Sequence, residues 1–274
     1  MVKKLYKYEF RSYLLWNLLI YAAVIASAIV LRLTLLIAFE GNRLTTLAFE
    51  ESNFLTDALF LASIAIYFIT VCAGFTLVAI MPIVRFYKNM LSSEGYLTLS
   101  IPVTPTTHIV AKTVVAYVYM IGQAVAFCLS VGIILIGWED SAEILKNIGE
   151  IFSEMVFYIK EEAPGIVVSC VAFMITCILS PIATLMMYYF CLSMGMLFGK
   201  YKIVGSVIIY IALQMAYSIL GGVFEIILMP FAFVIESEIV LILTLSIGIL
   251  LFTIAQICIY FGFTNHMFKH KVNI

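Results

Sequence analysis

The residue types that most often carry out chemistry are few in this chain and widely scattered. The three histidines are His108, His266 and His270, and none belongs to an H-E-x-x-H motif. No two of the six cysteines have the C-x-x-C spacing of a zinc site. Glu161 and Glu162 form an acidic pair like that of a glutamate-type intramembrane protease, but they lie in a loop rather than in a span. We therefore expect no catalytic residue and no metal ligand.

ATP chemistry is not expected in the chain either. The sequence lacks G-x-x-x-x-G-K-[ST], the loop that wraps the phosphates of ATP in P-loop enzymes. We therefore expect no cofactor in this chain, and any ATP-driven work requires a separate subunit.

The composition indicates a membrane protein. Of the 274 residues, 64% are hydrophobic and 11% are charged, whereas a soluble globular protein carries about 25% charged residues. Six apolar stretches each exceed the ~20 residues that an α-helix needs to cross a bilayer. They are Leu14 to Phe39, Ala58 to Val84, Ile109 to Trp138, Ile166 to Phe198, Ile203 to Ile235, and Ile239 to Phe263. The predicted fold class is an all-α membrane protein with six transmembrane helices, forming a single transmembrane domain over residues 1–274.

The distribution of charge predicts the orientation. With both termini in the cytoplasm, 11 of the 15 lysines and arginines fall on the cytoplasmic side, as the positive-inside rule requires. Thirteen of the 16 acidic residues then fall outside. Arg32 lies in the outer third of the first span, where its side chain can extend to the interface.

Two segments outside the spans have helical periodicity. In residues 1–13, Lys3, Lys7 and Arg11 recur every four residues, which predicts an interfacial helix along the cytoplasmic headgroups before the chain turns into the first span. The alternative interpretation is that these basic residues only set the orientation of the chain in the membrane. In residues 139–165, apolar residues recur at helical spacing, which predicts an amphipathic helix on the outer surface. Its apolar face would cover the membrane surface or a neighbouring subunit.

Residues 85–108, between the second and third spans, are predicted to form a rigid elbow. A short helix is expected to end near Gly95 in a left-handed C-cap, and the chain then runs extended because Pro102 and Pro105 restrict the residues before them. Thr106 or Thr107 would cap the next span. A rigid elbow can transmit force, although an ordinary capped turn would have the same features.

The fifth stretch is predicted to break. As one straight helix its 33 residues would measure ~50 Å, longer than the hydrocarbon core even when tilted. Gly221, Gly222 and Pro230 offer break points, and Glu225 would be costly in lipid unless it faces protein or water. We expect these four residues to belong to an outer gate or pathway, with helix–helix hydrogen bonding as the alternative role of Glu225.

Two roles are possible for the fourth stretch and for four uncharged polar residues. Ser180 and Pro181 predict a kink, and the methionine- and tyrosine-rich segment that follows is suited either to a greasy substrate path or to ordinary packing. The polar residues either bond a neighbouring helix or line a path. They are Asn17, Gln123, Gln214 and Gln256.

The elbow carries a resemblance to a known family. Its aromatic and basic helix, its Glu94-Gly95-Tyr96-Leu97 and its Ile101-Pro102-Val103 resemble the second cytoplasmic connection of ABC-2 type ABC transporter permeases, in particular the small bacterial six-span members. Residues 7–11, Lys-Tyr-Glu-Phe-Arg, resemble the family's lead-in helix. The resemblance covers the whole six-span arrangement. It implies a re-entrant segment between spans five and six and a coupling helix at residues 85–97 that docks on a separate ATPase. The coupling residues implied are Arg85, Tyr87, Lys88, Glu94, Gly95, Tyr96 and Leu97.

The expected function is that of the permease subunit of an ATP-driven exporter in a bacterial plasma membrane. Its partners would be a P-loop ATPase subunit carrying ATP and Mg²⁺, a second permease as homo- or heterodimer, and membrane lipids, but no nucleic acid. The substrate would be an amphiphilic peptide, drug or lipid-like molecule. The alternative is an immunity or sensory membrane protein that transports nothing.

Overall fold

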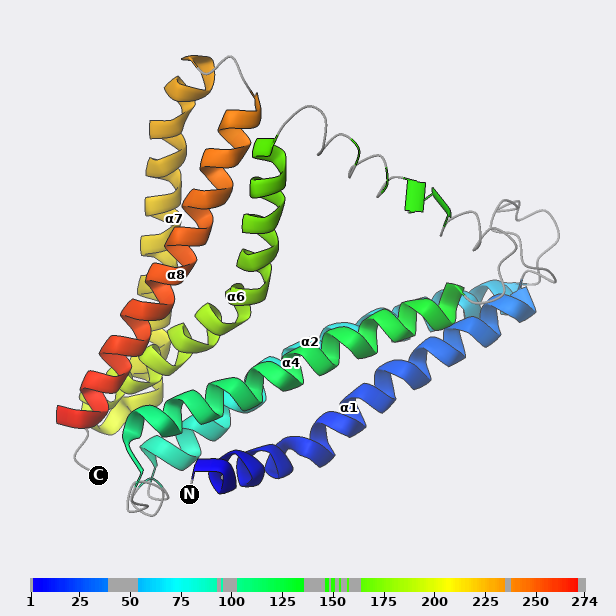
Figure 1. The fold of residues 1–274 in the computed structure, drawn as a ribbon. Helices are drawn as coiled ribbons and strands as arrows, with labels where there is room; N and C mark the ends of the chain where they lie inside the picture. Colours follow the sequence, from blue (N-terminus) through cyan, green and yellow to red (C-terminus); the bar gives the residue numbers. More distant parts are fainter. Residues whose placement is uncertain are drawn as a thin grey trace. The chain divides into compact units, whose positions relative to one another are not determined.

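Nearly all of the residues that the computed structural model describes are helical, and none of them forms a strand (Figure 1). It describes residues 2–38, 54–92, 95, 103–135, 146–147, 149–150, 153, 157, 164–234 and 238–270. The elements are α1 (Val2–Ala38), α2 (Phe54–Phe86), a π-helical turn η1 (Tyr87–Leu91), α4 (Pro105–Leu135), α6 (Pro164–Gly195), a 3₁₀ turn η2 (Met196–Tyr201), α7 (Lys202–Val234) and α8 (Glu238–His270).

Six of these helices are long and apolar enough to cross a membrane. In each, between 6% and 28% of the most apolar window is buried inside the protein. The remaining apolar side chains face outward. Such exposure is unfavourable in water but not in lipid. The prediction of a multi-pass helical membrane protein is therefore confirmed.

All six helices begin before the apolar stretches that predicted them, and α1 and α8 extend furthest beyond these stretches. The first stretch begins at Leu14, but α1 begins at Val2, and α8 continues past Phe263 to His270. A helix bonds its own backbone, so it need not stop where the hydrocarbon core stops. Residues 2–13 are thus continuous with the first span rather than a separate helix, although Figure 1 shows α1 bending after its first turns.

The predicted break in the fifth span is wrong. Residues Lys202–Val234 form one uninterrupted helix that includes Gly221 and Gly222. Glycine lowers helix propensity by about 1 kcal/mol but removes no backbone hydrogen bond, and in lipid an open backbone would cost more than that. The structure therefore shows no re-entrant segment within this range.

The chain divides into two compact units, and α2 and α4 contribute to both. The first, here called the α1 unit, comprises residues 3–81 and 114–156. Its buried cluster joins Tyr13 of α1, Val78 of α2, and Val115 and Tyr119 of α4. The Tyr21 hydroxyl donates to the carbonyl oxygen of Tyr119 at 2.6 Å. These contacts tie the three helices together.

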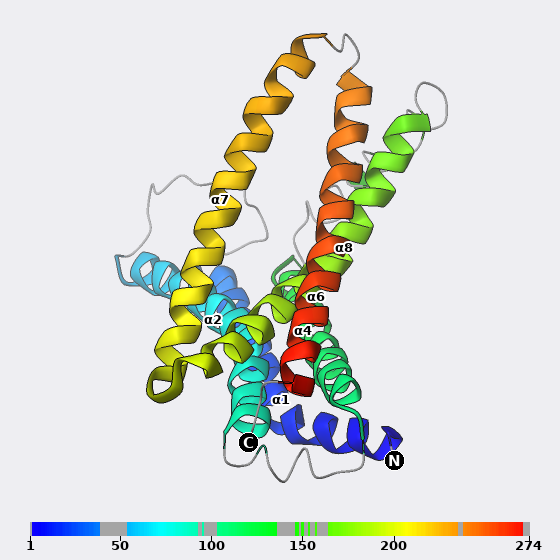
Figure 2. The same ribbon diagram turned by 90° about the vertical axis from the view of Figure 1, so that its left-hand side faces the viewer.

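The second unit, here called the α6–α8 unit, comprises residues 1–2, 82–113 and 157–274. Both ribbon views show α6 running beside α8 (Figures 1 and 2). Figure 2 also shows α7 joined to α6 through η2 and standing apart from α8 over much of its length. Figure 1 shows α6 bending near its middle, as its internal Pro181 predicts.

Two glycines allow the tight connection between α6 and α7. Gly199 in η2 has φ 56° and ψ −106°. Residues with a Cβ atom are strained in this conformation, whereas glycine is not. Gly195 lies so close to the first turn of α7 that a Cβ there would overlap the Ser206 hydroxyl and approach the Lys202 carbonyl oxygen to 2.6 Å. The small residue is therefore required for the close approach of the two helices.

We expect Gly195→Ala to destabilise the protein by about 1–3 kcal/mol, because the Cβ meets backbone that cannot move freely. The measurement is the thermal unfolding midpoint of the purified protein in detergent. Gly262→Ala in α8 is the matched control, since a Cβ at Gly262 meets nothing within 4 Å. Equal midpoints for the two variants would contradict the close approach.

Candidate functional site

The first part of the predicted elbow is described and differs from the expected short helix. The helix α2 passes directly into η1, where Arg85 and Tyr87 are half-buried and Lys88 is exposed. The Ser92 hydroxyl donates to the carbonyl oxygen of Lys88. A π-helical turn is rare and often marks a functional position. Here it turns Met90 and Leu91 into the interior.

Gly95 is helical and buried, and its N–H donates to the carbonyl oxygen of Ser92 at 2.8 Å. It therefore lies in a helical turn rather than in the left-handed cap that we expected. The other residues of the predicted coupling motif, Glu94, Tyr96 and Leu97, lie outside the described residues.

The elbow ends at α4, which begins at Pro105 rather than after Thr106 or Thr107. Thr104 is the residue before the first turn, and its carbonyl oxygen accepts the N–H of Thr107 at 3.0 Å. Proline is favoured at the first helical position because it has no N–H to leave unsatisfied. The residue that precedes the helix is therefore Thr104, rather than Thr106 or Thr107.

A buried aromatic cluster fastens both ends of the elbow to α6 and α8. The ring of Phe86 stacks on Tyr189 of α6 with centroids 4.0 Å apart and meets Phe268 of α8 edge-on at 5.9 Å. Ile109, at the start of α4, belongs to the same cluster and is fully buried. Movement of the elbow at either end would therefore act on α6 and α8.

Two polar residues of α4, His108 and Lys112, are also buried and lie one helical turn apart. No role was assigned to either residue from the sequence. Their spacing of four residues was the available signal, because it puts both on one face of the helix. Among the described residues, no three of histidine, cysteine, aspartate and glutamate come together to hold a metal ion.

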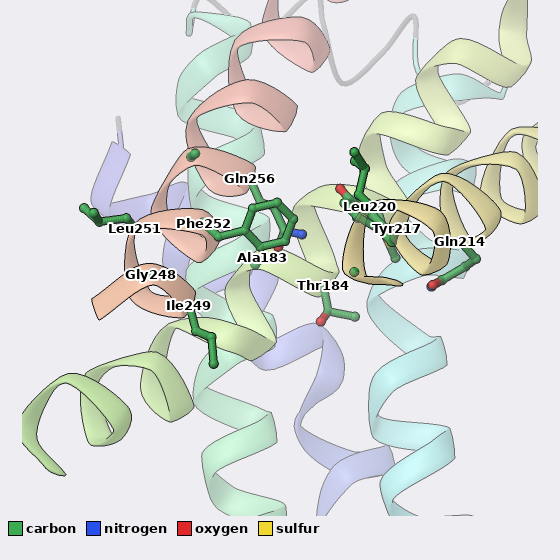
Figure 3. Close-up of a pocket in the computed structure, with 13 residues that line it drawn as sticks. Ala183, Thr184, Gln214, Tyr217, Leu220, Gly248, Ile249, Leu251, Phe252 and Gln256 are labelled. Atoms are coloured by element: carbon green, nitrogen blue, oxygen red, sulfur yellow. The ribbon is translucent and has the colours of Figure 1, made fainter. Parts of the chain in front are cut away.

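A cavity of about 900 Å³ lies among α6, α7 and α8, near the middle of each helix (Figure 3). None of its lining residues is charged. They are Ala183, Thr184, Met187, Gln214, Tyr217, Leu220, Gly221, Gly248, Ile249, Leu251, Phe252, Ala255 and Gln256. Leu220 and Leu251 are 57% and 61% exposed, so one side of the cavity opens on the outer surface of this unit.

Polar groups in the cavity are held by neighbours. Tyr217 of α7 and Gln256 of α8 both contribute hydrogen-bonding groups to the wall of the cavity. Nε2 of Gln214 donates to the Tyr210 hydroxyl at 3.1 Å. The ring of Tyr217 meets Phe252 edge-on at 5.9 Å, and Figure 3 shows both side chains beside the space between the helices. The site can therefore offer uncharged donors and acceptors within an apolar wall.

The aromatic cluster and the cavity share Met187. One methionine of the ambiguous segment thus packs in the interior and also lines the cavity. This residue gives a direct contact path from the elbow, through Phe86 and Tyr189, to the cavity wall.

The four predicted gate residues are not brought together as a site in the described structure. Gly221 lines the cavity, whereas Gly222 does not. The side chains of Glu225 and Pro230 lie outside the description.

The four uncharged polar residues fall into two groups. Gln214 and Gln256 line the cavity, whereas Nδ2 of Asn17 donates to the Tyr13 carbonyl oxygen in its own helix at 2.9 Å. Gln123 is fully buried in the α1 unit, where a Cβ on Gly74 would lie 2.7 Å from its Nε2.

Sequence reasoning missed Thr184, Tyr217, Gly248 and Phe252 as cavity residues. A signal was present, because Gln214, Tyr217 and Gly221 have the spacing of one helix face, as do Gly248, Phe252 and Gln256.

Tyr87 lines a second, smaller cavity of about 440 Å³ with Gly199, Tyr201, Lys202, Ile203 and Val204. The cavity therefore brings the elbow next to the η2 turn. It offers a recess beside a basic residue at the end of the helices.

Comparisons with protein-family models, curated proteins and solved structures find no match to this chain.

We expect Phe86→Ala to lower the free energy of unfolding by about 3–5 kcal/mol, because it removes a buried ring from contact with two helices. The measurement is again the thermal unfolding midpoint in detergent. Phe173→Ala on α6 is the control, since Phe173 is 63% exposed. A small, equal loss in both variants would show that Phe86 does not fasten the elbow.

Proposed function

We propose that the chain is the permease subunit of an ABC-2 type exporter in a bacterial plasma membrane. A separate P-loop ATPase would dock at the coupling segment of the elbow, residues 85–97, and a second permease would complete the transporter. The substrate would be an amphiphilic peptide, drug or lipid-like molecule taken from the cytoplasm or the inner leaflet.

One observation carries the proposal. Phe86 and Ile109, at the two ends of the elbow, belong to one buried cluster with Tyr189 and Phe268. Packed side chains transmit a displacement because they have few alternative arrangements. A push on the elbow would therefore reach α6 and α8, and through Met187 the cavity wall.

The docking surface would combine Lys88 with the recess beside Tyr87. Lys88 is exposed, and the recess is lined by Tyr87 and Lys202. Such a surface suits an acidic groove on an ATPase, because charge complementarity guides docking and excludes wrong partners. The closure of two ATPase subunits on ATP would then move the elbow.

The orientation that this mechanism needs has both termini in the cytoplasm. We expect green fluorescent protein fused after residue 274 to fluoresce and alkaline phosphatase fused there to be inactive. Fusions within residues 139–165 should give the reverse pattern. An active phosphatase at the C-terminus would place the elbow outside the cell and defeat the docking proposal.

The main test is co-purification with a P-loop ATPase subunit, followed by an ATPase assay in nanodiscs. We expect Lys88→Glu to reduce the co-purified ATPase about tenfold or more, because it reverses the charge at the docking surface. Lys146→Glu, which changes a 75% exposed lysine beside Glu150, should have no effect.

If no ATPase binds the wild-type chain, the exporter proposal fails and an immunity or sensory role becomes the better explanation. Equal ATPase binding by both lysine variants would instead reject the docking surface. Size-exclusion profiles of the variants control for folding.

A further inference from the structure

We infer that the cavity among α6, α7 and α8 is a binding site for a neutral amphiphile of drug size that enters from the lipid. The inference does not rest on the exporter proposal, because binding to this site requires no ATPase and would equally serve a sensory protein.

The size and position of the cavity define the kind of ligand. Its volume of about 900 Å³ lies near the upper end of the 300–1,000 Å³ range of small-molecule sites. The lining runs from Ala183 to Met187 on α6 and from Gly248 to Gln256 on α8, or about 12 Å along the longer stretch at 1.5 Å per residue. A transmembrane helix of a partner would need a groove along ~30 Å. The cavity therefore suits a compact molecule.

The chemistry of the wall defines the ligand's charge. No lining residue is charged, and the site lies near the middle of three membrane helices. An ion there would lose its hydration without gaining a counter-charge, which is strongly unfavourable. A fully apolar ligand, in turn, would make no use of Gln214, Tyr217 and Gln256. A largely apolar ligand with one or two uncharged hydrogen-bonding groups therefore fits both the uncharged wall and its polar side chains.

The way in is on the lipid side. Leu220 on α7 and Leu251 on α8 both line the cavity and are both more than half exposed. The two helices stand apart in Figure 2, and Tyr217 on α7 and Gln256 on α8 both line the cavity between them. A hydroxyl or amide of the ligand can hydrogen-bond to the Tyr217 hydroxyl or the Gln256 amide, because both groups donate and accept.

Glycine gives a clean way to fill the cavity. Gly248 lines it, and a Cβ at Gly248 meets nothing within 4 Å. Phenylalanine at this position would therefore occupy cavity space without displacing protein. Gly262 is on the same helix, has equally open surroundings and lies outside the cavity, so Gly262→Phe is the matched control.

The test uses the full chain in phosphatidylcholine nanodiscs with a photoreactive, alkyne-tagged monoacylglycerol as the probe. We expect saturable labelling of peptides from α6, α7 and α8, competed by unlabelled monoacylglycerol and read by mass spectrometry. Gly248→Phe should reduce this labelling at least fivefold, and Gly262→Phe should leave it within twofold of wild type. A parallel arm with photoreactive phosphatidylcholine measures bulk lipid, which should label without saturation and without sensitivity to Gly248→Phe.

Gln256→Leu provides a second variant that keeps the volume and removes the amide. It should weaken monoacylglycerol binding about three- to tenfold, in keeping with the loss of one hydrogen bond. The proposal is overturned if labelling does not saturate, if Gly248→Phe labels like wild type, or if phosphatidylcholine competes as well as monoacylglycerol. It is also overturned if Gly248→Phe changes self-association while labelling is unaffected, because the cavity would then be covered by a second copy.

Discussion

Hydrocarbon provides no hydrogen-bonding partner for a peptide group, so every backbone N–H and C=O inside the membrane must be satisfied by the protein. A continuous helix meets this requirement with its own residues. The constraint explains why α1 is unbroken across its apolar stretch. It also explains why α7 continues through Gly221 and Gly222, where glycine would end many helices in water.

The same constraint governs polar side chains in the spans. Hydroxyl groups donate to carbonyl oxygens three or four residues earlier in their own helix, as Thr176 does to Ala172 at 2.8 Å and Ser193 to Tyr189 at 2.7 Å. Such bonds satisfy the hydroxyl but join no helices. The bonds between helices are therefore the informative ones, and they include Thr34 to Ser63 at 2.7 Å and Tyr67 to Ser130 at 2.8 Å in the α1 unit. In the α6–α8 unit, Tyr217 of α7 and Gln256 of α8 both line the cavity.

Aromatic rings and a cavity give the α6–α8 unit two different properties. The stack of Phe86 on Tyr189 is tightly packed and holds the elbow to α6, whereas the nearby space lined by Tyr217 and Gln256 is open to a ligand. Met187 lies in both, and methionine adapts its shape more readily than branched or aromatic side chains. Met187 thus lies between the rigid Phe86–Tyr189 stack and the open cavity. This arrangement supports the proposal that movement of the elbow is coupled to a bound amphiphile.

The sequence by itself determined the six membrane-spanning helices and the kink proline of α6, because hydrophobic length and backbone chemistry are local properties. It could not determine which polar residues serve a site. Gln123 and Gln256 are the same residue type in equally apolar stretches, yet one is buried in the α1 unit and the other lines a cavity. Nor could it identify Phe86 as a buried anchor among 21 phenylalanines. Lipid is as apolar as a protein interior, so hydropathy does not distinguish a side chain that faces lipid from one that faces a neighbouring helix. Only the packing of helices from distant parts of the chain decides that difference.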